Sequence, residues 1–216
     1  MFVVEKNPKS IAAEAYRSLK TNIQYSSFDK EYKTIVVTSS NPGEGKSTTA
    51  GNLALTLAEG EARVLLVDCD MRKPSVHKNF RVTNTYGLSD VLLQKQKVMD
   101  VAHVYKKNLH IITSGKIPPN PAEMLASKSM TLFLEEMKEH FDYIVLDTPP
   151  VQAVADPQIL STKVDGTLVV VRAGVTKKED VQNSIATLKK VNANIIGTVL
   201  HAVDNSRNKY YYYYGD

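Results

Sequence analysis

Cysteine is almost absent from this chain: Cys69 is the single cysteine in 216 residues. One thiol cannot form an internal disulfide or a cysteine-rich metal site, which excludes disulfide-stabilised folds and iron–sulfur carriers. Long apolar runs are also missing, since none approaches the roughly 20 residues that a membrane-spanning helix needs. Residues 1–10 lack the apolar stretch of a signal peptide. We therefore expect a cytoplasmic protein.

An excess of one charge is lacking as well. The 27 Lys and Arg residues against 23 Asp and Glu give a net charge of +4, without a dense basic block. This pattern does not favour a nucleic-acid groove, and no nucleic-acid partner is expected. With 43% hydrophobic residues, the chain is long enough for one α/β domain with a full core. We assign that domain to residues 1–203 and a polar, mobile tail to residues 204–216.

Short, uniformly apolar segments alternate with amphipathic ones along the chain. In residues 10–26 the apolar positions Ile11, Ala15, Leu19 and Ile23 recur every four residues, which predicts a helix with one buried stripe. Further helices are expected over residues 47–59 and from residue 177. Buried strands are expected at residues 34–38, 64–68, 109–113, 143–147, 167–171 and 195–200.

Apolar strands that alternate with helices are typical of a parallel sheet covered on both faces. The sequence therefore predicts an α/β fold with a doubly wound, mostly parallel sheet and helices on both faces. At the last of these helices, Thr176 and Glu179 have the spacing of a capping box.

One loop has the pattern of a phosphate-binding loop. It lies between an expected strand and an expected helix, so glycines can bring backbone N–H groups to an anion and the helix adds its positive end. Lys46 is expected to reach the β- and γ-phosphates of a nucleotide, and the Ser47 hydroxyl to bind Mg²⁺. The predicted nucleotide-binding residues are Ser40, Asn41, Pro42, Gly43, Glu44, Gly45, Lys46, Ser47 and Thr48.

Two of the expected strands end in carboxylates. Asp68 and Asp70 occupy alternate positions after one apolar run, and Asp147 ends another. The carboxyl ends of such strands face the nucleotide in this kind of sheet. Three carboxylates there can hold the water shell of Mg²⁺ and accept a proton from an attacking hydroxyl. Asp147 is predicted as a metal ligand, because an apolar run that ends in Asp commonly accompanies a phosphate-binding loop.

Five consecutive tyrosines lie close to the end of the chain, followed by one glycine and one aspartate. Five adjacent phenols on a polar tail cannot all be buried, so we interpret them as acceptors of a phosphoryl group. A sticky aromatic terminus is the alternative interpretation. The predicted phosphorylation sites are Tyr210, Tyr211, Tyr212, Tyr213 and Tyr214.

The order of these motifs resembles the bacterial tyrosine kinases of capsule and exopolysaccharide synthesis, over essentially the whole chain. The matching segments are residues 39–48, 67–74, 146–150 and the tyrosine cluster, and residues 114–121 are similar to a proline-rich loop of that family. The chain is similar to the separate cytoplasmic kinase subunit of Gram-positive systems. The resemblance implies an ATP- and Mg²⁺-dependent protein-tyrosine kinase that phosphorylates its own tyrosine cluster between subunits of a ring and regulates polysaccharide synthesis and export.

The resemblance also implies roles for single residues. Asp68 would be the catalytic base, with Lys46 and Asp70 as further catalytic residues. Asp70 and Asp147 would organise Mg²⁺, which Ser47 would bind directly.

Two further positions are compared with the family. Glu14, Arg17 and Lys20 are similar to its oligomerisation motif, although Lys20 stands where arginine is usual and so lacks the bidentate fork. A solvated helix face is the alternative interpretation of these three residues. His201 stands where relatives often carry an asparagine that reads the adenine, and is predicted to contact the base by stacking or by donating a hydrogen bond. An ordinary histidine at a strand end is the alternative interpretation.

The partners that the resemblance implies are the cytoplasmic segment of a membrane-spanning adaptor, further copies of the chain, and a protein-tyrosine phosphatase. The adaptor would recruit the chain to the inner face of the membrane. Two other functions stay open: a partitioning or cell-division type of ATPase, and a non-catalytic ATP-gated adaptor. Those ATPases usually carry an early lysine in the loop, where this chain has Asn41. The tyrosine tail favours the kinase.

Overall fold

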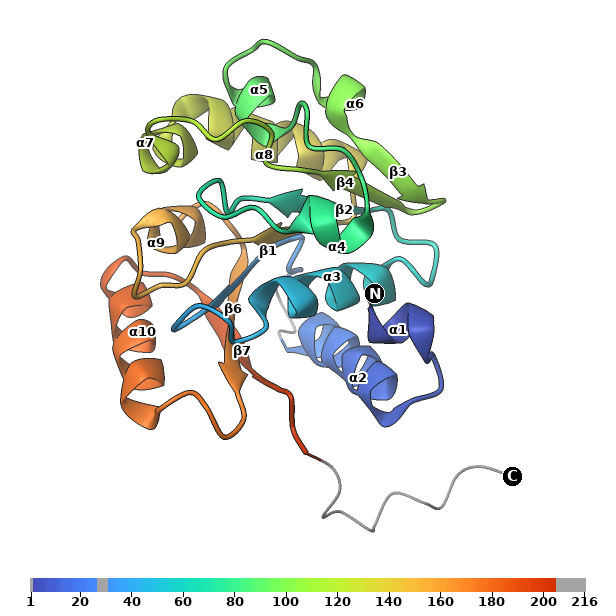
Figure 1. Ribbon diagram of the computed structural model, residues 1–216, viewed down its shortest axis with the longest axis vertical. Helices are drawn as coiled ribbons and strands as arrows, with labels where there is room; N and C mark the ends of the chain where they lie inside the picture. The colour runs from blue at the N-terminus through green and yellow to red at the C-terminus, as the bar shows by residue number, and fades with distance from the viewer. Residues whose placement is uncertain (1, 27–30, 205–216) are drawn as a thin grey trace.

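The computed structural model describes residues 2–26 and 31–204 (Figure 1). In these residues seven strands form one sheet in the order β3-β4-β2-β5-β1-β6-β7. Every neighbouring pair is parallel except β3 and β4. The strands are β1 (Thr34–Ser39), β2 (Val64–Asp68), β3 (His103–Lys106), β4 (Leu109–Ile112), β5 (Tyr143–Asp147), β6 (Gly166–Arg172) and β7 (Ile195–His201).

Helices cover both faces of the sheet (Figure 1). Successive strand residues point to opposite faces, so Ile35 and Val37 of β1 join the core under α1–α4, whereas Val36 joins the core under α5–α9. Helix α10 covers the same face as α5–α9, over β6. The helices are α1 (Val3–Lys6), α2 (Ile11–Tyr25), α3 (Lys46–Leu57), α4 (Val76–Phe80), α5 (Leu88–Leu92), α6 (Val98–Val101), α7 (Pro121–Ala126), α8 (Lys128–His140), α9 (Asp156–Ser161) and α10 (Lys178–Lys190).

The six predicted strands are confirmed to within about one residue at each end, and so is the doubly wound α/β fold. Strand β3 was not predicted from the sequence. It is a four-residue edge strand that runs antiparallel to β4, and its residues are alternately half-buried and exposed. One covered face is usual for an antiparallel edge, so β3 lacks the continuous apolar run that marks the central strands.

The helix predicted over residues 10–26 is present as α2, with the Ser10 hydroxyl accepting a hydrogen bond from the Ala13 N–H at 3.2 Å. Its buried stripe was predicted only in part: of the four expected residues, Ile23 is buried and Leu19 is half-buried. The buried residues are Ala13, Tyr16 and Ile23, whereas Ile11 is 48% exposed. Because a helix repeats every 3.6 residues, a strict four-residue spacing drifts around its axis and leaves the buried face.

The predicted capping box of α10 is also wrong. The helix begins at Lys178, and its N-cap residue Lys177 has no side-chain hydrogen bond. The Thr176 hydroxyl instead donates a hydrogen bond to the Glu44 carboxylate at 2.8 Å. Thr176, which the local pattern assigned to a helix cap, therefore makes a tertiary contact with the phosphate-binding loop.

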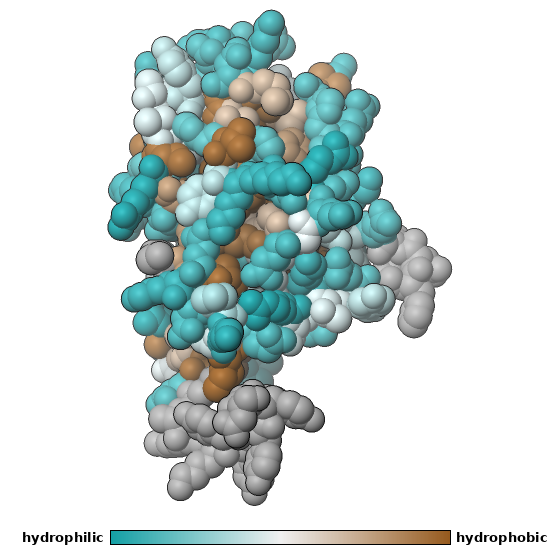
Figure 2. All heavy atoms as spheres, turned by 90° about the vertical axis from the view of Figure 1, so that its right-hand side faces the viewer, coloured by the Kyte–Doolittle hydropathy of each residue, from teal (hydrophilic) through white to brown (hydrophobic). Residues whose placement is uncertain are grey.

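Among residues 2–26 and 31–204, no helix is long and apolar enough to cross a membrane. On the side of the molecule that carries α1 and β3, hydrophobic side chains form small patches among hydrophilic ones (Figure 2). The predicted phosphorylation sites at residues 210–214 lie outside the described residues.

Candidate active site

The phosphate-binding loop connects the end of β1 to the start of α3, as predicted. Gly43 and Gly45 have φ angles of +79° and +98°, in the left-handed region that favours glycine. At Gly45 a side chain is excluded for a second reason: a Cβ atom there would lie 2.3 Å from the ring of His201. The loop therefore needs glycine both for its backbone turn and for the close approach of β7.

Hydrogen bonds inside the chain brace this loop. The carboxylate of Glu44 is buried and accepts hydrogen bonds from the Asn41 N–H at 3.0 Å and the Thr176 hydroxyl at 2.8 Å. Arg172, at the end of β6, donates to the Gly43 carbonyl at 2.9 Å. Glu44, predicted as a nucleotide-binding residue, thus lies in the loop as an internal brace.

Asn41 also turns toward its own chain. Its side-chain amide donates to the Asp180 carboxylate of α10 at 3.0 Å. Ser40, which replaces the usual first glycine of the motif, has a buried hydroxyl without a hydrogen-bond partner among the described residues. The loop is therefore joined to the start of α10 through Asn41, and this side chain is turned away from an anion bound by the loop backbone and Lys46.

Lys46 lies between two carboxylates. Its ammonium is 2.9 Å from Asp70 and 3.9 Å from Asp147, and 3.4 Å from the Ser47 hydroxyl. Burial by itself lowers the pKa of Lys46, but the negative charges of Asp147 and Asp70 outweigh it, so the pKa is raised above its ordinary value. The predicted phosphate ligand and the predicted metal ligands thus meet at one point.

Asp147, the last residue of β5, is fully buried, and neither carboxylate oxygen has a hydrogen-bond partner in the described part of the chain. Burial raises its pKa to about 6, against the opposing effects of the Lys46 ammonium and the Ser47 hydroxyl. Bare oxygens beside a serine hydroxyl fit Mg²⁺, which proteins typically hold through one or two carboxylates together with substrate phosphates. No group of three or more metal-ligating side chains gathers within residues 2–26 and 31–204.

Asp68 is held quite differently. It pairs in register with Asp147 on the neighbouring strand. Its oxygens accept hydrogen bonds from the N–H groups of Asp70 at 3.1 Å, Ser75 at 3.0 Å and Val76 at 2.9 Å. Burial and the charge of Asp147 raise its pKa to about 7 despite these bonds. A pKa near 7 suits a proton acceptor, but in this conformation the carboxylate is buried and anchors the loop that leads to α4.

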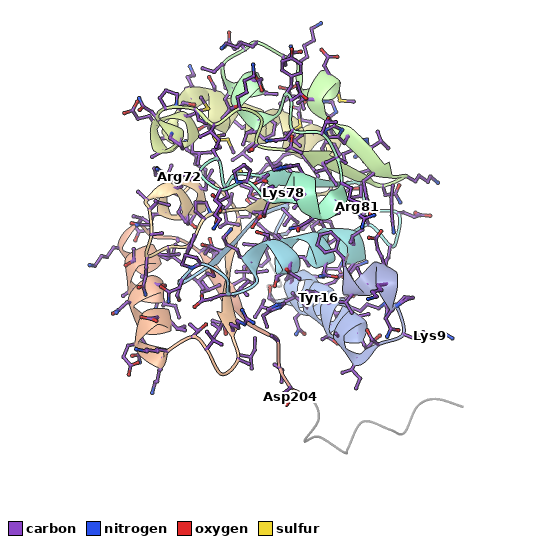
Figure 3. All side chains as sticks on the ribbon, in the orientation of Figure 1. Lys9, Tyr16, Arg72, Lys78, Arg81 and Asp204 are labelled. Carbon is purple, nitrogen blue, oxygen red and sulfur yellow. The ribbon has the colours of Figure 1, made fainter. Side chains whose placement is uncertain are left out.

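An ion pair that no sequence pattern indicated stands beside these carboxylates. Arg72 donates two hydrogen bonds to the Asp156 carboxylate, at 3.0 and 3.1 Å. Figure 3 shows Arg72 beside α9, at the edge of the sheet where β2 and β5 end. Arg72 follows the aspartate motif and Asp156 opens a helix, yet nothing in the sequence pairs two residues so far apart.

His201 lies where β7 ends, against the phosphate-binding loop. Burial and the nearby Arg172 guanidinium lower its pKa, which favours the neutral form of the ring. It lines a mainly apolar cavity of about 540 Å³ between α2, α3 and β7, together with Thr48, Asn52 and Leu19. A cavity of that size beside the loop has room for the base of a nucleotide, and the predicted base contact stays a prediction.

All three predicted oligomerisation residues contact their own chain. Arg17 pairs with Glu14 at 2.9 Å and with Glu59 at 3.3 Å, and the Lys20 ammonium donates to the Thr56 carbonyl at 3.3 Å. Glu14 keeps 68% of its side chain exposed. The subunit contact is untested and stays a prediction.

Comparison with known proteins gives consistent results. A model of the AAA domain matches residues 32–200. The chain is similar to tyrosine-protein kinase YwqD of Bacillus subtilis, with 43% identity over 96% of this chain and 88% of that protein. It is also similar to tyrosine-protein kinase CpsD of Streptococcus pneumoniae serotype 4, with 38% identity over 92% and 88%. Among solved structures, the kinase domain of Escherichia coli tyrosine kinase ETK superposes with a TM-score of 0.91 at 33% identity, covering 100% of this chain and 85% of that one.

Proposed function

The chain belongs to the bacterial tyrosine-protein kinases, and on this premise we propose that it uses ATP and Mg²⁺ to phosphorylate tyrosines 210–214 of its own tail. One observation carries the proposal. The Lys46 ammonium stands 2.9 Å from Asp70 and 3.9 Å from Asp147 at the mouth of the phosphate-binding loop. In this arrangement Lys46 can leave the carboxylates and bind the phosphates of a nucleotide. Asp70 and Asp147 can then bind a metal ion in place of Lys46.

In this proposal the phosphates bind the loop by its backbone. Gly43 and Gly45 allow the N–H groups to face one anion, and the first turn of α3 adds its positive end. Lys46 turns from the carboxylates to the phosphates and offsets part of their charge. The internal bonds of Glu44 keep the loop in shape while this happens.

Asp147, Asp70 and the Ser47 hydroxyl would hold the metal ion. The bare oxygens of Asp147 support its place in this set. When bound, Mg²⁺ offsets the charge that develops on the β- and γ-phosphates during transfer. Asp147 and Asp70 would then have their negative charge offset by the metal ion, which they bind as ligands, and no longer by Lys46.

Asp68 would orient the acceptor phenol or accept its proton. Its pKa of about 7 supports this role. Since its oxygens are bound to the N–H groups of Ser75 and Val76, the proposal requires the 69–75 loop to shift when the acceptor enters. The cavity beside His201 would hold the base.

The cellular role is proposed on the same premise. We place the activity in the regulation of capsular or extracellular polysaccharide synthesis and export. The chain would act in the cytoplasm, recruited to the inner face of the membrane by the cytoplasmic segment of an adaptor that activates it. A protein-tyrosine phosphatase would reverse the modification. Candidate adaptor segments, added to purified protein and MgATP, should raise the rate of labelling.

The decisive experiment incubates purified protein with MgATP and maps phosphotyrosine by mass spectrometry. Phosphate on residues 210–214 is expected. A chain truncated after Asp204 should neither be labelled nor release inorganic phosphate rapidly. Rapid phosphate release without the tail would instead favour an ATPase, although the inward-turned side chain of Asn41 gives no support to that alternative.

Transfer is proposed to pass between subunits. A Lys46→Met chain that carries the tail is mixed with an active chain truncated after Asp204. Phosphate on the inactive chain's tail is the expected result. Labelling of intact wild type at every dilution, with none in the mixture, would place the reaction within one chain.

The proposed ring is tested separately. Changing Arg17 and Lys20 together to alanine removes two partly exposed charges and should affect folding little. Light scattering is expected to show a smaller particle than wild type. An unchanged mass, with wild type larger than a monomer, would place the subunit contact elsewhere on the surface.

A further inference from the structure

Two neighbouring strands of the sheet, β2 and β5, are joined by an ion pair at each end. At their amino ends, Arg63 lies 3.5 Å from Asp142, and both side chains are about half exposed, at 57% and 46%. At their carboxyl ends, Arg72, whose side chain is 42% exposed, forms its two bonds to Asp156, whose side chain is 0% exposed. The second pair therefore has a fully buried acceptor and a two-point geometry, and it lies at the end of the strands where the candidate active site lies.

This carboxyl-end pair connects the two loops that carry the metal-binding carboxylates. Arg72 comes two residues after Asp70, and Asp156 begins α9, the helix that follows the loop from Asp147. The ladder of β2 and β5 ends where Cys69 donates its N–H to the Asp147 carbonyl at 2.8 Å. Beyond that bond, the spacing between the two loops depends on side chains.

Lys46 is the other cation that holds the loops together, through Asp70 and Asp147. In the proposed function it leaves these carboxylates for the phosphates of ATP. Asp70 then keeps a bond from the Lys73 N–H at 2.9 Å within its own loop. The link from Arg72 to Asp156 involves neither Lys46 nor these two carboxylates, so it does not depend on that exchange.

We propose that Arg72 is a positioning residue, which through Asp156 fixes the spacing of Asp70 and Asp147 and so determines how tightly the metal ion of the nucleotide complex is held. The inference rests on the proposed function, because it concerns the metal-bound nucleotide. Arg72 need not touch the metal or the phosphates. Its planar guanidinium matches the carboxylate at two points, which a lysine ammonium cannot do.

The test is Arg72→Lys in the full chain, because this substitution keeps the positive charge near buried Asp156 and removes only the two-point geometry. ADP binding is measured by titration calorimetry at a series of Mg²⁺ concentrations. The Mg²⁺ concentration for half-maximal tightening should rise roughly tenfold or more, as is typical when a supporting residue of a metal site is changed. ADP affinity without Mg²⁺ should be unchanged, since the phosphate-binding loop is intact, and this measurement also shows that the variant is folded.

Two more variants sharpen the result. Asp156→Asn keeps the shape of the acceptor and should shift the Mg²⁺ dependence in the same direction. Arg63→Lys makes the same chemical change at the other end of the same strands and should leave it unaltered. In kinase assays, excess Mg²⁺ should restore the turnover of Arg72→Lys, which a general structural defect would not allow.

Either of two results overturns the inference: Arg72→Lys with the Mg²⁺ dependence of wild type, or an equal shift in Arg63→Lys. If wild type itself bound ADP without any effect of Mg²⁺, the proposed function would fail and the inference with it. If ADP binding by wild type depends on Mg²⁺ and Arg72→Lys shows the same dependence, the positioning role of Arg72 is wrong, but the proposed function stands.

Discussion

The two sides of the candidate active site differ in how far each is complete before any ligand binds. On one side, the phosphate-binding loop contains the buried Glu44 carboxylate, which accepts hydrogen bonds from Asn41 and Thr176. Arg172 donates a further hydrogen bond to the Gly43 carbonyl of the same loop. On the other side Asp147 is fully buried with both oxygens unpartnered. The loop is a finished scaffold, whereas the carboxylate side carries charge that only a cation can offset.

This difference explains why the same cluster can serve binding and oppose stability. A buried carboxylate without a partner raises the free energy of the folded state. Lys46 offsets this in part, at 3.9 Å from Asp147. In the proposed function Lys46 turns to a phosphate and the Asp147 carboxylate becomes available to a metal ion, so the unfavourable burial of this charge would favour the binding of both ligands.

Lys46→Met should have the largest effect, because it alters both the phosphate-binding loop and the carboxylate side of the site. Methionine is similar in length but lacks the charge that serves the phosphates and offsets Asp70 and Asp147. Phosphotyrosine formation should fall by at least about 10²–10³-fold, as when a group that stabilises transition-state charge is removed. The fold should survive, because one carboxylate can take up a proton. Labelling with MgATP and circular dichroism check the two statements, and more than a trace of labelling would separate the loop from the phosphate donor.

Asp147→Asn and Asp68→Asn should move the stability of the nucleotide-free protein in opposite directions. Asp147→Asn removes a buried charge that Lys46 offsets only in part, and each kcal/mol gained should raise the unfolding temperature by about 2–4 °C in a chain of this size. Asp68→Asn should destabilise by about 1–3 kcal/mol, because the N–H groups of Ser75 and Val76 lose part of their acceptor. Thermal unfolding measures both.

The same pair separates binding from catalysis. Asp147→Asn should raise the Mg²⁺ requirement by about tenfold or more, since even residues that only support a metal ligand cost that much. Asp68→Asn should lower phosphate transfer by roughly 10²-fold or more with near-normal MgATP binding. Equal loss of nucleotide binding in both variants would contradict separate roles for the two residues.

The free energy of unfolding of the nucleotide-free protein should also depend on pH, because the buried carboxyl groups Asp68 and Asp147 have raised pKa values. The folded-state pKa values of Asp68 and Asp147, raised to about 7 and about 6, exceed the ordinary 3.8. Between about pH 4 and 7 the folded state then binds protons more readily than the unfolded chain, so these groups add stability as pH falls. Three partly buried histidines with lowered pKa act the other way: His77, His110 and His201.

The histidine effect cancels in a comparison with Asp147→Asn. The difference in free energy of unfolding between that variant and wild type should be largest near pH 8 and should shrink as the pH falls to about 5. Urea unfolding of the nucleotide-free proteins at several pH values measures it. A difference that stays constant with pH would mean that Asp147 has an ordinary pKa, and one that grows toward acid would mean a depressed pKa.

Thr176→Val probes the finished side and should have the smallest effect. It removes the hydroxyl that donates to Glu44 and that accepts from the Arg172 N–H. The loss of such bonds is worth about 1 kcal/mol, or a few-fold in nucleotide affinity, without a change in Mg²⁺ dependence. The control is Thr21→Val, whose hydroxyl bonds only to the Arg17 carbonyl one helical turn away. A loss of Mg²⁺ dependence in Thr176→Val would mean that the two sides are not independent.

Patterns made by neighbouring residues were predicted well. The central strands, with buried residues on both faces, appeared as continuous apolar runs, and the strand ends at Asp68 and Asp147 were located to the residue. The prediction of which side of α2 faces the core was right only in part, since Ile23 is buried. Ile11 was expected in the buried stripe of α2 but lines the cavity beside β7.

The sequence by itself determined the phosphate-binding loop, because its function is carried by consecutive backbone groups and by glycines whose conformations are local. It also determined that carboxylates stand at strand ends. Only the tertiary structure decided how those carboxylates differ. Strand order puts Asp68 beside Asp147, the turn into α4 supplies N–H groups to one and none to the other, and Arg72 meets Asp156 across two loops. Charge interactions depend on distance and burial, and for residues so far apart in the chain both are set by the fold.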